Sequence, residues 1–442
     1  MIDIYAVGGY TEVGKNCTAI KIDDEVIVID LGLALENYIK LTEDADIIKI
    51  SPEKLMDAGA VPDISVLNKI KNKVKAIVIS HAHLDHMGAV PYIASQFKAP
   101  VICTPFTAEV IRSILKDDKI KLDNEIKVLN SNSSIKISEN IKIEFIHITH
   151  SVPQTVLIAI HTKYGIIMYA NDFKLDLRPT LGKIPNFKRI EELANEGIYA
   201  LIVESTYAKD AKKMPSESVA KEMLRDVLLG IDNKDNVIIA TTFSSHLARL
   251  KSIIEFGKKL NRKIIFLGRS LAKYTRAGEN VGIIHFSKKI EIVKYSKQIR
   301  KRLNKIEEDR GKYLLVVTGH QGEHNSVLYK IARGEFKFKL KPEDNMIFSC
   351  TTIPTPTNIA NREALENELK LSGIRIFKDI HQSGHAAKED LRDFINLVKP
   401  KNIIPAHGDK EMKNALVDLT VEMGYKTDKN VFLVKDGHKI SL

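Results

Sequence analysis

The sequence contains only three cysteines, Cys17, Cys103 and Cys350, and they lie far apart along the chain. Their odd number and the absence of a Cys-x-x-Cys pair argue against a disulfide framework and against a zinc site built from thiolates. Each lies in an apolar or threonine-rich stretch. We therefore interpret all three as small buried hydrophobic residues.

Long apolar runs are missing as well, because no stretch of about 18 apolar residues occurs anywhere in the chain. The N-terminal segment MIDIYAVGGYTEVGKN lacks the basic region, the apolar stretch and the small-residue cleavage site of a signal peptide. These absences predict a soluble, cytoplasmic protein without a membrane partner.

Apolar residues are nevertheless numerous enough for a large core, since 44% of the 442 residues are hydrophobic. A chain of this length favours two globular units and argues against a disordered or fibrous class. The formal net charge is +11. Such an excess favours a polyanionic partner such as nucleic acid, although many lysine-rich proteins bind nothing anionic.

The first half of the chain reads as short β-branched strands separated by Gly, Asn and Asp turns. The predicted strands are 26–30, 74–80, 99–104, 141–148, 156–162 and 165–170. Helices over 87–97 and 105–116 are expected to lie over the sheet. This pattern predicts a layered α/β architecture in which loops at strand ends carry the functional residues.

From about residue 205 to residue 350, helical and apolar strand segments alternate, which predicts parallel βαβ units. The expected helices are 216–229, 245–260 and 271–280, and the expected strands are 236–241, 262–268, 313–319 and 345–350. A helix at 358–371, a strand at 375–381 and a helix at 387–397 follow. Because site-like histidines occur on both sides, we predict a domain at 206–351 inserted into a first domain formed by 1–205 and 352–442.

The segment Ser80-His81-Ala82-His83-Leu84-Asp85-His86 follows a predicted strand directly and precedes a predicted helix. On a loop at a strand end, this spacing lets His81 and His83 face one ion while Asp85 and His86 reach a neighbouring position. Three histidines and one aspartate at such fixed places are rare by chance, so a simple polar turn is a poor alternative.

Three further candidate ligands follow apolar strands: His150 after IKIEFIHIT, Asp172 after GIIMYAN and His407 after NIIPA. Each of them alone would more often be a core or cap residue. Their shared place at strand ends, together with the first motif, points to a site with two ions. Imidazole and carboxylate ligands without thiolate suit Zn²⁺, and a carboxylate-rich half would also accept Mn²⁺.

Together these residues resemble the metallo-β-lactamase superfamily. The match consists of His81, His83, Asp85 and His86 in the HxHxDH signature, Asp30 in VIVIDLG, His150 in THS, Asp172 in YANDF and His407 in PAHGD. The resemblance implies an αββα sandwich. It also implies one ion on His81, His83 and His150, a second on Asp85, His86 and His407, and Asp172 as a bridge. Asp30 would orient the histidine loop by hydrogen bonds.

Two such ions, ~3.5–4 Å apart, lower the pKa of a bridging water, so that hydroxide is available near neutral pH as the nucleophile. The resemblance therefore predicts a hydrolase with two divalent ions, with Zn²⁺ as the expected metal and Mn²⁺ or Mg²⁺ as alternatives for activity. The same kind of site can also cleave lactams and thioesters, so the metal motif leaves the substrate open.

The chain further resembles the β-CASP nucleases and, within them, the ribonuclease J family. The likeness rests on GGYTEVGKN, GAVPDIS, SHAHLDHMGAVPY, HSVPQT, YANDFKLD, TTFSSHLAR and VTGHQGE, and on Glu204, His385 and His407. It runs from about residue 5 to about residue 410 and implies an inserted β-CASP α/β domain of the parallel-sheet type. Histidine at position 407 resembles RNA-processing members rather than DNA-repair members.

The turn His381-Gln382-Ser383-Gly384-His385 looks like the phosphate-binding loop of the family. Its glycine permits close backbone approach, and its hydroxyl and imidazoles can donate to phosphate oxygens. His385 would stabilise the transition state or protonate the leaving oxygen, with Glu204 holding it in one tautomer.

We thus expect Asp85, His385 and Glu204 to be the catalytic residues. Ser244, Ser245 and His246 in TTFSSHLAR supply hydroxyls at a helix start. They form either a second phosphate cradle or a helix cap, and the sequence does not distinguish these alternatives.

The resemblance predicts a 5′→3′ exoribonuclease that degrades single-stranded RNA and prefers 5′-monophosphate ends. The alternatives are an RNA endonuclease of the same branch, a small-molecule thioesterase or lactonase, and a non-catalytic RNA-binding scaffold. A small-molecule enzyme has no use for the insert or the HQSGH loop. A decayed scaffold would have lost ligands, whereas all seven are present.

The chain departs from the bacterial members of the family, because it ends about 35 residues past His407 and lacks their C-terminal domain. In this respect it resembles a short, archaeal-like form. It also shows no N-terminal KH module, which the archaeal cleavage-factor-like members of the branch carry, and this argues against an endonuclease of the 3′-end-processing type. The C-terminal domain often supports dimerisation, so a homodimer remains open.

Overall fold

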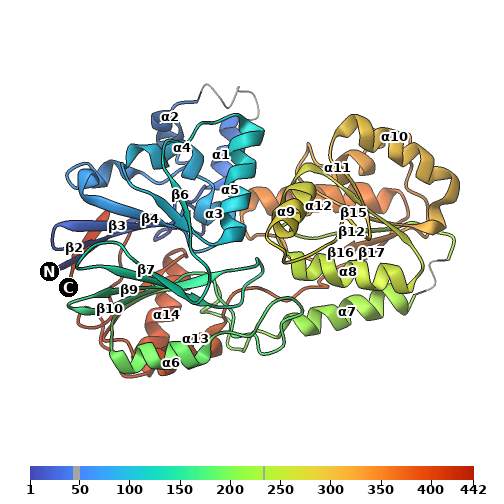
Figure 1. Cartoon of the computed structure of the whole chain (residues 1–442). Helices are drawn as coiled ribbons and strands as arrows, with labels where there is room; N and C mark the ends of the chain where they lie inside the picture. The colour runs from blue at the N-terminus through green and yellow to red at the C-terminus, as the bar shows by residue number, and fades with distance from the viewer. Residues whose placement is uncertain (43–49, 232–233) are drawn as a thin grey trace. The chain divides into compact units, whose positions relative to one another are not determined.

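The computed structural model describes residues 1–42, 50–231 and 234–442 (Figure 1). Within this part of the chain there are two compact units. Unit 1 comprises residues 1–177, 184–214 and 384–442, and unit 2 comprises residues 178–183 and 215–383. Unit 1 is therefore discontinuous, with unit 2 inserted into it, as the sequence predicted.

Unit 1 contains two sheets packed face to face. The first has the order β19 (His438–Ser441), β1 (Ile2–Gly8), β2 (Cys17–Ile22), β3 (Glu25–Ile29), β4 (Val74–Val78), β5 (Val101–Cys103) and β6 (Ile126–Val128). The second has the order β18 (Asn402–Ala406), β11 (Ile198–Glu204), β10 (Gly165–Ala170), β9 (Val156–Thr162), β8 (Lys142–His147) and β7 (Ser133–Lys136). Ile27 of the first sheet and Ile158 and Ile202 of the second belong to one buried cluster between them.

Helices cover the outer faces of both sheets (Figure 1). On the side of the first sheet lie α1 (Leu35–Thr42), α2 (Pro52–Asp57), α3 (Leu84–Met87), α4 (Val90–Ile93) and α5 (Pro105–Asp118), and on the side of the second lie α6 (Phe187–Glu196), α13 (Lys388–Val398) and α14 (Lys410–Glu422). A second apolar cluster joins the outer face of the second sheet to Ile190, Leu391 and Leu416 of these helices. The predicted αββα sandwich is confirmed.

The inner strands are almost continuously apolar because both of their faces are buried. β4 and β11 hydrogen-bond to parallel neighbours on both sides. The side chains of β11 alternate between the two apolar clusters, with Ala200 and Ile202 in the first and Leu201 and Val203 in the second. The carboxyl ends of parallel strands meet at one edge of a sheet. Loops that follow these strands are thereby gathered at that edge.

The single helix predicted over 87–97 is wrong. The chain instead forms α3, α4 and a 3₁₀ turn at Ala94–Gln96. Pro91 lies in the first turn of α4, and because proline has no backbone N–H it cannot continue a helix that began earlier. The helix predicted at 105–116 is present as α5.

Unit 2 is built on a parallel sheet of six strands. Their order is β14 (Glu291–Val293), β13 (Lys263–Leu267), β15 (Tyr313–Val317), β12 (Ile238–Thr241), β16 (Asn345–Phe348) and β17 (Arg375–Phe377). The helices are α7 (Glu217–Leu229), α8 (Leu247–Lys259), α9 (Arg269–Asn280), α10 (Ser296–Ile306), α11 (Val327–Ala332) and α12 (Pro356–Leu371). Parallel strands need crossover connections, which these helices supply. The segment from β14 through α10 had not been predicted as a strand and a helix.

The chain returns to unit 1 later than predicted. The sequence placed the return at residue 352, whereas the structure places it at residue 384. The reason is that β17 pairs in parallel with β16, with Asn345 opposite Arg375, so α12 and β17 complete the sheet of unit 2. The continuous part of the insert starts at residue 215 rather than at the predicted residue 206, and Tyr207 forms a β-bridge with Ala387 inside unit 1.

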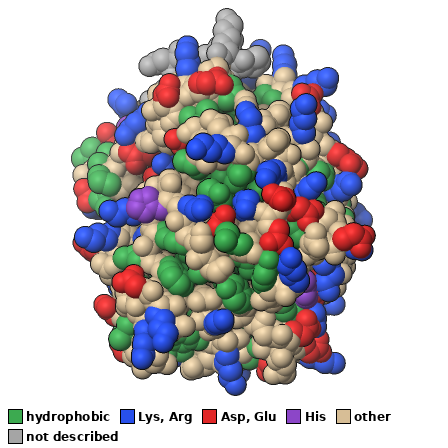
Figure 2. Space-filling model, turned by 90° about the vertical axis from the view of Figure 1, so that its left-hand side faces the viewer, with side chains coloured by type: hydrophobic (Ala, Val, Ile, Leu, Met, Phe, Trp, Pro, Cys, Tyr) green, Lys and Arg blue, Asp and Glu red, His purple; other side chains and the backbone are tan. Residues whose placement is uncertain are grey.

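The three cysteines are buried and free, as predicted. In the described part of the chain, no helix has both the length and the apolar character needed to span a membrane. Figure 2 shows one face of the molecule, on which basic, acidic and apolar side chains are intermingled. The net positive charge of the chain is therefore not evenly distributed over this face.

Candidate metal centre

All seven predicted metal ligands meet in unit 1. His81, His83, Asp85 and His86 follow β4, and the others follow β8, β10 and β18 in turn. Since these strands present their ends at one edge of the sandwich, residues up to 326 positions apart in the sequence come together. They form two groups that share Asp172.

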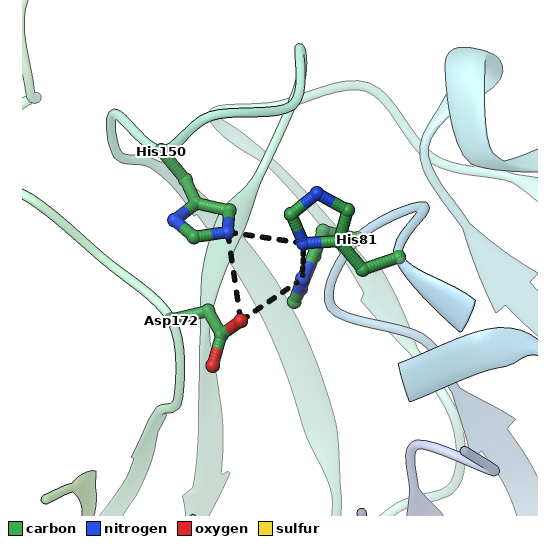
Figure 3. Close-up of side chains that lie close together, drawn as sticks. His81, His150 and Asp172 are labelled. Atoms are coloured by element: carbon green, nitrogen blue, oxygen red, sulfur yellow. Dashed lines mark hydrogen bonds and ion pairs between the residues drawn. The ribbon is translucent and has the colours of Figure 1, made fainter. Parts of the chain in front are cut away.

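The first group consists of His81, His83, His150 and Asp172. His83 Nδ1 lies 3.1 Å from His81 Nε2 and 3.1 Å from His150 Nε2. Asp172 Oδ2 lies 3.4 Å from His81 Nε2 and 3.5 Å from His150 Nε2. Figure 3 shows the side chains of His81, His150 and Asp172 turned toward one another. Four potential ligand atoms thus surround one small space.

The second group consists of Asp85, His86, Asp172 and His407. His86 Nε2 lies 3.3 Å from Asp172 Oδ2, and His407 Nε2 lies 3.2 Å from Asp172 Oδ1. Asp85 Oδ2 lies 3.5 Å from His86 Nε2 and 3.8 Å from His407 Nε2. Because Asp172 faces both groups, it is placed where a bridging carboxylate would be needed.

The outer nitrogens of four histidine rings are held by acceptors. His150 Nδ1 donates to the carbonyl of Gly384 at 2.7 Å, and His407 Nδ1 donates to Asn16 Oδ1 at 2.8 Å. His86 Nδ1 donates to Asp30 Oδ2 at 2.7 Å. His81 Nδ1 faces Ser80 Oγ at 3.0 Å, and that hydroxyl already donates to Asp30. The hydrogen-bond partners thus assign the proton to the outer nitrogen and a lone pair to the inner one.

These residues fit divalent metal ions. With the protons on the outer nitrogens, the inner nitrogens are acceptors, and they lie at about hydrogen-bond distance from one another. The lone pairs of these nitrogens repel, and a cation bound between them would remove the repulsion. Asp172 is 1% exposed, and its Oδ1 has no hydrogen-bond donor within the described residues. An unsatisfied buried carboxylate oxygen is costly unless a cation binds it. Imidazole and carboxylate ligands suit zinc and related ions.

Burial supports the neutral imidazole form that binds metals. It lowers the pKa of His81, His150 and His407, and it lowers the pKa of His83 to about 3. For His86, burial opposes the charged form, but the carboxylates of Asp172, Asp85 and Asp30 raise its pKa well above the ordinary value. A second cation bound beside these carboxylates would compete for the same negative charge.

Asp30 organises the histidine loop, as the resemblance implied. It is completely buried, and its two oxygens accept from the backbone N–H and hydroxyl of Ser80, each at 2.8 Å. The same carboxylate accepts from His86 and, at 2.9 Å, from the hydroxyl of Tyr169. Asp30, Asp172 and His407 all have positive φ, at 59°, 61° and 49°. Such strained backbone is held in place by the surrounding contacts.

Asn16 is a site residue to which the sequence analysis assigned no role. Its side chain is buried, accepts from His407 Nδ1, donates to the backbone oxygen of Asp85 at 3.0 Å, and lies 3.1 Å from His86 Nε2. It therefore touches three ligands of the second group. The only signal for it was its place in the motif GGYTEVGKN.

The expected pairing of Glu204 with His385 is present beside the metal groups. His385 Nδ1 donates to Glu204 Oε2 at 2.7 Å and lies 4.0 Å from Asp172 Oδ1. Glu204 is completely buried, and its other oxygen accepts from the backbone N–H of Phe173 at 2.9 Å. Burial lowers the pKa of His385, but Glu204 and Asp172 outweigh burial and raise it to about 9.

The predicted loop 381–385 is divided between the units, with Gly384 and His385 in unit 1. A Cβ on Gly384 would lie 2.7 Å from the backbone nitrogen of Ser151 and 2.9 Å from His150 Nδ1. Only glycine therefore allows its carbonyl to approach His150. In unit 2, Gln382 donates to Met223 Sδ at 3.7 Å, and Ser383 is buried.

The structure separates the two alternatives for residues 244–246. His246 is the N-cap of α8, where its Nδ1 accepts from the backbone N–H of Arg249 at 3.2 Å. Ser245 and His246 are 6% and 3% exposed, and the cap contact favours the helix-cap alternative for His246. Ser244 is partly exposed and bonds to Ser270 Oγ at 3.1 Å. Of the three candidates for a phosphate contact, Ser244 is the most accessible.

Arg249 was also missed. It is completely buried in unit 2 and forms a bidentate ion pair with Glu217, at 2.7 and 2.8 Å. Its remaining nitrogen donates to the backbone oxygens of Ser349 and Ile380 at 2.9 and 3.1 Å, and lies 3.3 Å from His381 Nδ1. Arg249 thus joins the ends of β16 and β17 to the start of α7. The available signal was a lone arginine on the apolar face of a predicted helix.

Family models cover most of the chain. A model of the metallo-β-lactamase superfamily matches residues 10–179, and one of the ribonuclease J β-CASP domain matches residues 234–367. A third model, described as a Zn-dependent metallo-hydrolase RNA specificity domain, matches residues 374–434. Ribonuclease J of Methanocaldococcus jannaschii is 42% identical over 442 residues, covering 100% of this chain and 98% of the relative. The chain belongs to the ribonuclease J family.

Other ribonuclease J sequences agree. That of Pyrococcus abyssi is 41% identical, covering 100% of this chain and 97% of the relative. Ribonuclease J 1 of Streptococcus pyogenes is 31% identical, and the alignment covers 100% of this chain and 74% of that protein. A solved structure of a protein of unknown function from Enterococcus faecalis V583 matches with a TM-score of 0.68 at 18% identity, covering 100% of both chains. At this identity the structural match shows the fold alone.

Asn16→Ala is expected to weaken metal binding by about 10–100-fold, because His407 would lose the acceptor that orients its ring. The zinc retained during dialysis against increasing chelator, measured by atomic emission, tests this. Asn37→Ala is the matched control, since the Asn37 amide donates to the Gly59 carbonyl at 3.3 Å and Asn37 belongs to neither ligand group. Equal zinc retention by the Asn16 variant and wild type would refute the role given to Asn16.

Arg249→Met should lower the free energy of unfolding by about 3–5 kcal/mol, because it removes the guanidinium that pairs with both oxygens of the buried Glu217 carboxylate and leaves His246, 3.4 Å away, beside it. The double variant Arg249→Met/Glu217→Met should be less destabilised than the single variant, since no uncompensated charge remains. Urea unfolding followed by circular dichroism measures both. Simple additivity of Arg249→Met and Glu217→Met would contradict the assignment of a coupled buried pair.

Proposed function

We propose that the protein is a metal-dependent ribonuclease that degrades single-stranded RNA from the 5′ end and prefers a 5′-monophosphate. The observation that carries this proposal is the His385–Glu204 pair set 4.0 Å from the carboxylate shared by two metal-ligand groups. A small-molecule hydrolase needs the ligand groups alone. The additional imidazole, on the loop that resembles a phosphate-binding turn, suits phosphodiester cleavage.

Two divalent ions fit the site, and Zn²⁺ is the metal we propose, with Mn²⁺ or Mg²⁺ as alternatives that support activity. His81, His83 and His150 would hold one ion, Asp85, His86 and His407 the other, and Asp172 would bridge them. When bound, such ions activate water at neutral pH and stabilise charge on oxygens at phosphorus. The proposed ligand set is the one that the resemblance implied.

The protein's own residues would perform the remaining steps. His385 would donate a hydrogen bond or proton to an oxygen of the scissile phosphate, and Glu204 would keep its Nδ1 protonated and the ring oriented. The side chain of Asp85 is 31% exposed, whereas Asp172 is 1% exposed. Asp85 is thus the ligand carboxylate that water reaches most easily, and we assign it the role of orienting the attacking water.

RNA is the proposed substrate for two reasons. The family model that matches residues 374–434 is described as an RNA specificity domain, and curated relatives at 42% and 41% identity are named ribonuclease J. Ser244, His381, Gln382, Ser383 and Gly384 are the proposed contacts for phosphates of the RNA. The 5′→3′ direction and the preference for a 5′-monophosphate rest on the resemblance to ribonuclease J.

The decisive assay uses single-stranded RNA with a 3′ fluorophore and either a 5′-monophosphate or a 5′-triphosphate. We expect progressive shortening from the 5′ side, faster with the monophosphate and abolished by chelator, on a sequencing gel. His83→Ala should abolish cleavage while largely keeping RNA binding, because it removes a ligand but no RNA contact. Discrete internal cuts that ignore the 5′ group would identify an endonuclease. Absence of cleavage of either RNA would favour a small-molecule hydrolase.

His385→Ala should lower kcat by about 10²–10⁴-fold with unchanged zinc content, since general acid catalysis contributes that much. Glu204→Gln should lower kcat in the same direction with little change in KM, because it disturbs the orientation of His385 rather than substrate binding. Glu196→Gln is the control, since that carboxylate is exposed and pairs with Arg189 on α6. A raised KM at constant kcat in the Glu204 variant would contradict this role.

A further inference from the structure

The positive charge of the chain is concentrated in one segment of unit 2. Residues 285–306, HFSKKIEIVKYSKQIRKRLNKI, contain eight Lys and Arg side chains and one acidic residue, Glu291. The segment therefore carries +7 of a chain total of +11. Neither the metal centre nor the proposed phosphate-binding residues use any of it. A charge this local requires an explanation other than general solubility.

The helix of this segment, α10, presents its basic residues away from the core. Ile299, Leu303 and Ile306 are its buried side chains. Lys297, Lys301 and Lys305 are exposed, four residues apart on the opposite face. Like charges at this spacing destabilise a helix, and a lysine in the first turn opposes the helix dipole. In the described residues, none of these three lysines has an ion-pair partner.

A groove lies between α10 and the edge strand β14. It has a volume of about 320 Å³ and is lined by Glu291, Ile292, Val293, Gln298, Lys301, Arg302 and Lys305. The one acidic residue is neutralised within the groove, because Arg302 Nε lies 2.9 Å from both Glu291 oxygens. Lys301 and Lys305 then leave the groove positive. It is suited to a linear anion rather than to a cation.

An exposed aromatic residue stands beside this groove. Tyr295, which connects β14 to α10, is 55% exposed, more than any other aromatic side chain in the described part of the chain. Lys294 Nζ lies 5.4 Å from the centre of its ring. A planar ring next to a line of cations is the combination that binds single-stranded nucleic acid, in which bases stack and phosphates pair with lysines.

The position of the groove in unit 2 is compatible with the proposed RNA contacts. The strands β14, β13, β15 and β12 are parallel neighbours, so Tyr295 after β14 and Ser244 after β12 lie at the same edge of the sheet. Three strand spacings separate β14 from β12, which corresponds to roughly 14 Å. One strand of RNA could therefore run along this edge.

We propose that the α10 groove, formed by Glu291–Val293, Tyr295 and the exposed face of α10, binds the backbone of single-stranded RNA at nucleotides other than those held by the proposed contacts at Ser244. Lys297, Lys301 and Lys305 pair with phosphates, and Tyr295 stacks on a base. The inference rests on the proposed function for the identity of the substrate. An acidic polypeptide would satisfy the lysines but would give Tyr295 no base to stack on.

The test compares the full-length triple variant Lys297→Gln/Lys301→Gln/Lys305→Gln with wild type. The probes are RNAs of about 30 and about 4 nucleotides with non-cleavable phosphorothioate linkages, followed by fluorescence anisotropy. For the long RNA we expect roughly 10-fold weaker binding, and a salt dependence of log K shallower by about 2, because three phosphate contacts are lost. Binding of the short RNA should change less, because its three linkages cannot occupy the proposed phosphate contacts and all three lysines at once. Tyr295→Ala should weaken long-RNA binding without changing the salt slope.

The matched control is Lys69→Gln/Lys71→Gln/Lys75→Gln, which makes the same charge change at exposed positions around the start of β4. This is the end of the strand opposite the histidine loop. Equal weakening by the two triple variants would overturn the proposal, because it would show an effect of net charge alone. Unchanged binding of long RNA by the groove variant would also overturn it. If that variant instead lost affinity for polyglutamate, the groove would be a site for an acidic polypeptide.

Cleavage is measured separately, so that this proposal and the proposed function can fail independently. With cleavable RNA, the groove variant should raise KM for the long substrate and leave kcat on the short substrate unchanged. If the wild-type protein binds long RNA through the groove but cleaves neither RNA, the proposed ribonuclease activity is refuted and the proposed RNA binding by the groove stands. If both triple variants cleave RNA as the wild type does, with equal KM, the proposed RNA binding by the groove is refuted and the ribonuclease activity stands.

Discussion

The buried carboxylate of Asp30 is the group on which the metal centre depends. It accepts hydrogen bonds from the backbone and hydroxyl of Ser80, from His86 and from Tyr169, and so joins β3, the histidine loop and β10. A buried carboxylate is tolerated only when its lone pairs are satisfied. The donors that satisfy Asp30 include Ser80 and His86 of the histidine loop. The same hydrogen bonds therefore stabilise the buried carboxylate and orient the metal-ligand residues.

The same principle extends to the other ligands. Each of four imidazoles has an acceptor at its outer nitrogen, supplied by Ser80, Asp30, Gly384 or Asn16. The inner lone pairs therefore converge on Asp172 before any ion is considered. In unit 2 a buried charge has a comparable structural role, since Arg249 ties the ends of β16 and β17 to Glu217. In both units, charged groups inside the fold fix loops at strand ends.

Membership of the ribonuclease J family and the geometry of unit 1 are independent observations that are both consistent with a metal-dependent hydrolase. The first comes from relatives aligned along the whole chain. The second comes from seven side chains in two groups, within each of which the potential ligand atoms lie within 4.8 Å of one another. The α10 groove is different, because its evidence is charge, exposure and position rather than resemblance. It places a possible RNA contact on an element that the motifs do not include.

Spacing within the sequence predicted the parts of the site that are local. His81, His83, Asp85 and His86 lie on one short loop, so their pattern was visible without a structure. The positions of His150, Asp172 and His407 at the ends of strands could also be predicted from the sequence, because each follows an apolar run. The helix predicted at 87–97 failed at Pro91, whose missing N–H outweighed the apolar pattern of the segment.

Thus the sequence alone determined the fold class, the inserted arrangement and the candidate ligands, since periodicity and residue chemistry are properties of the chain itself. Only the tertiary structure decided the return to unit 1 at residue 384, the roles of Asn16 and Arg249, and the use of His246 as a cap. Each of these depends on a partner distant in sequence or on the direction of a side chain. Strand pairing, burial and hydrogen-bond partners are set by packing, and packing has no local signature in the sequence.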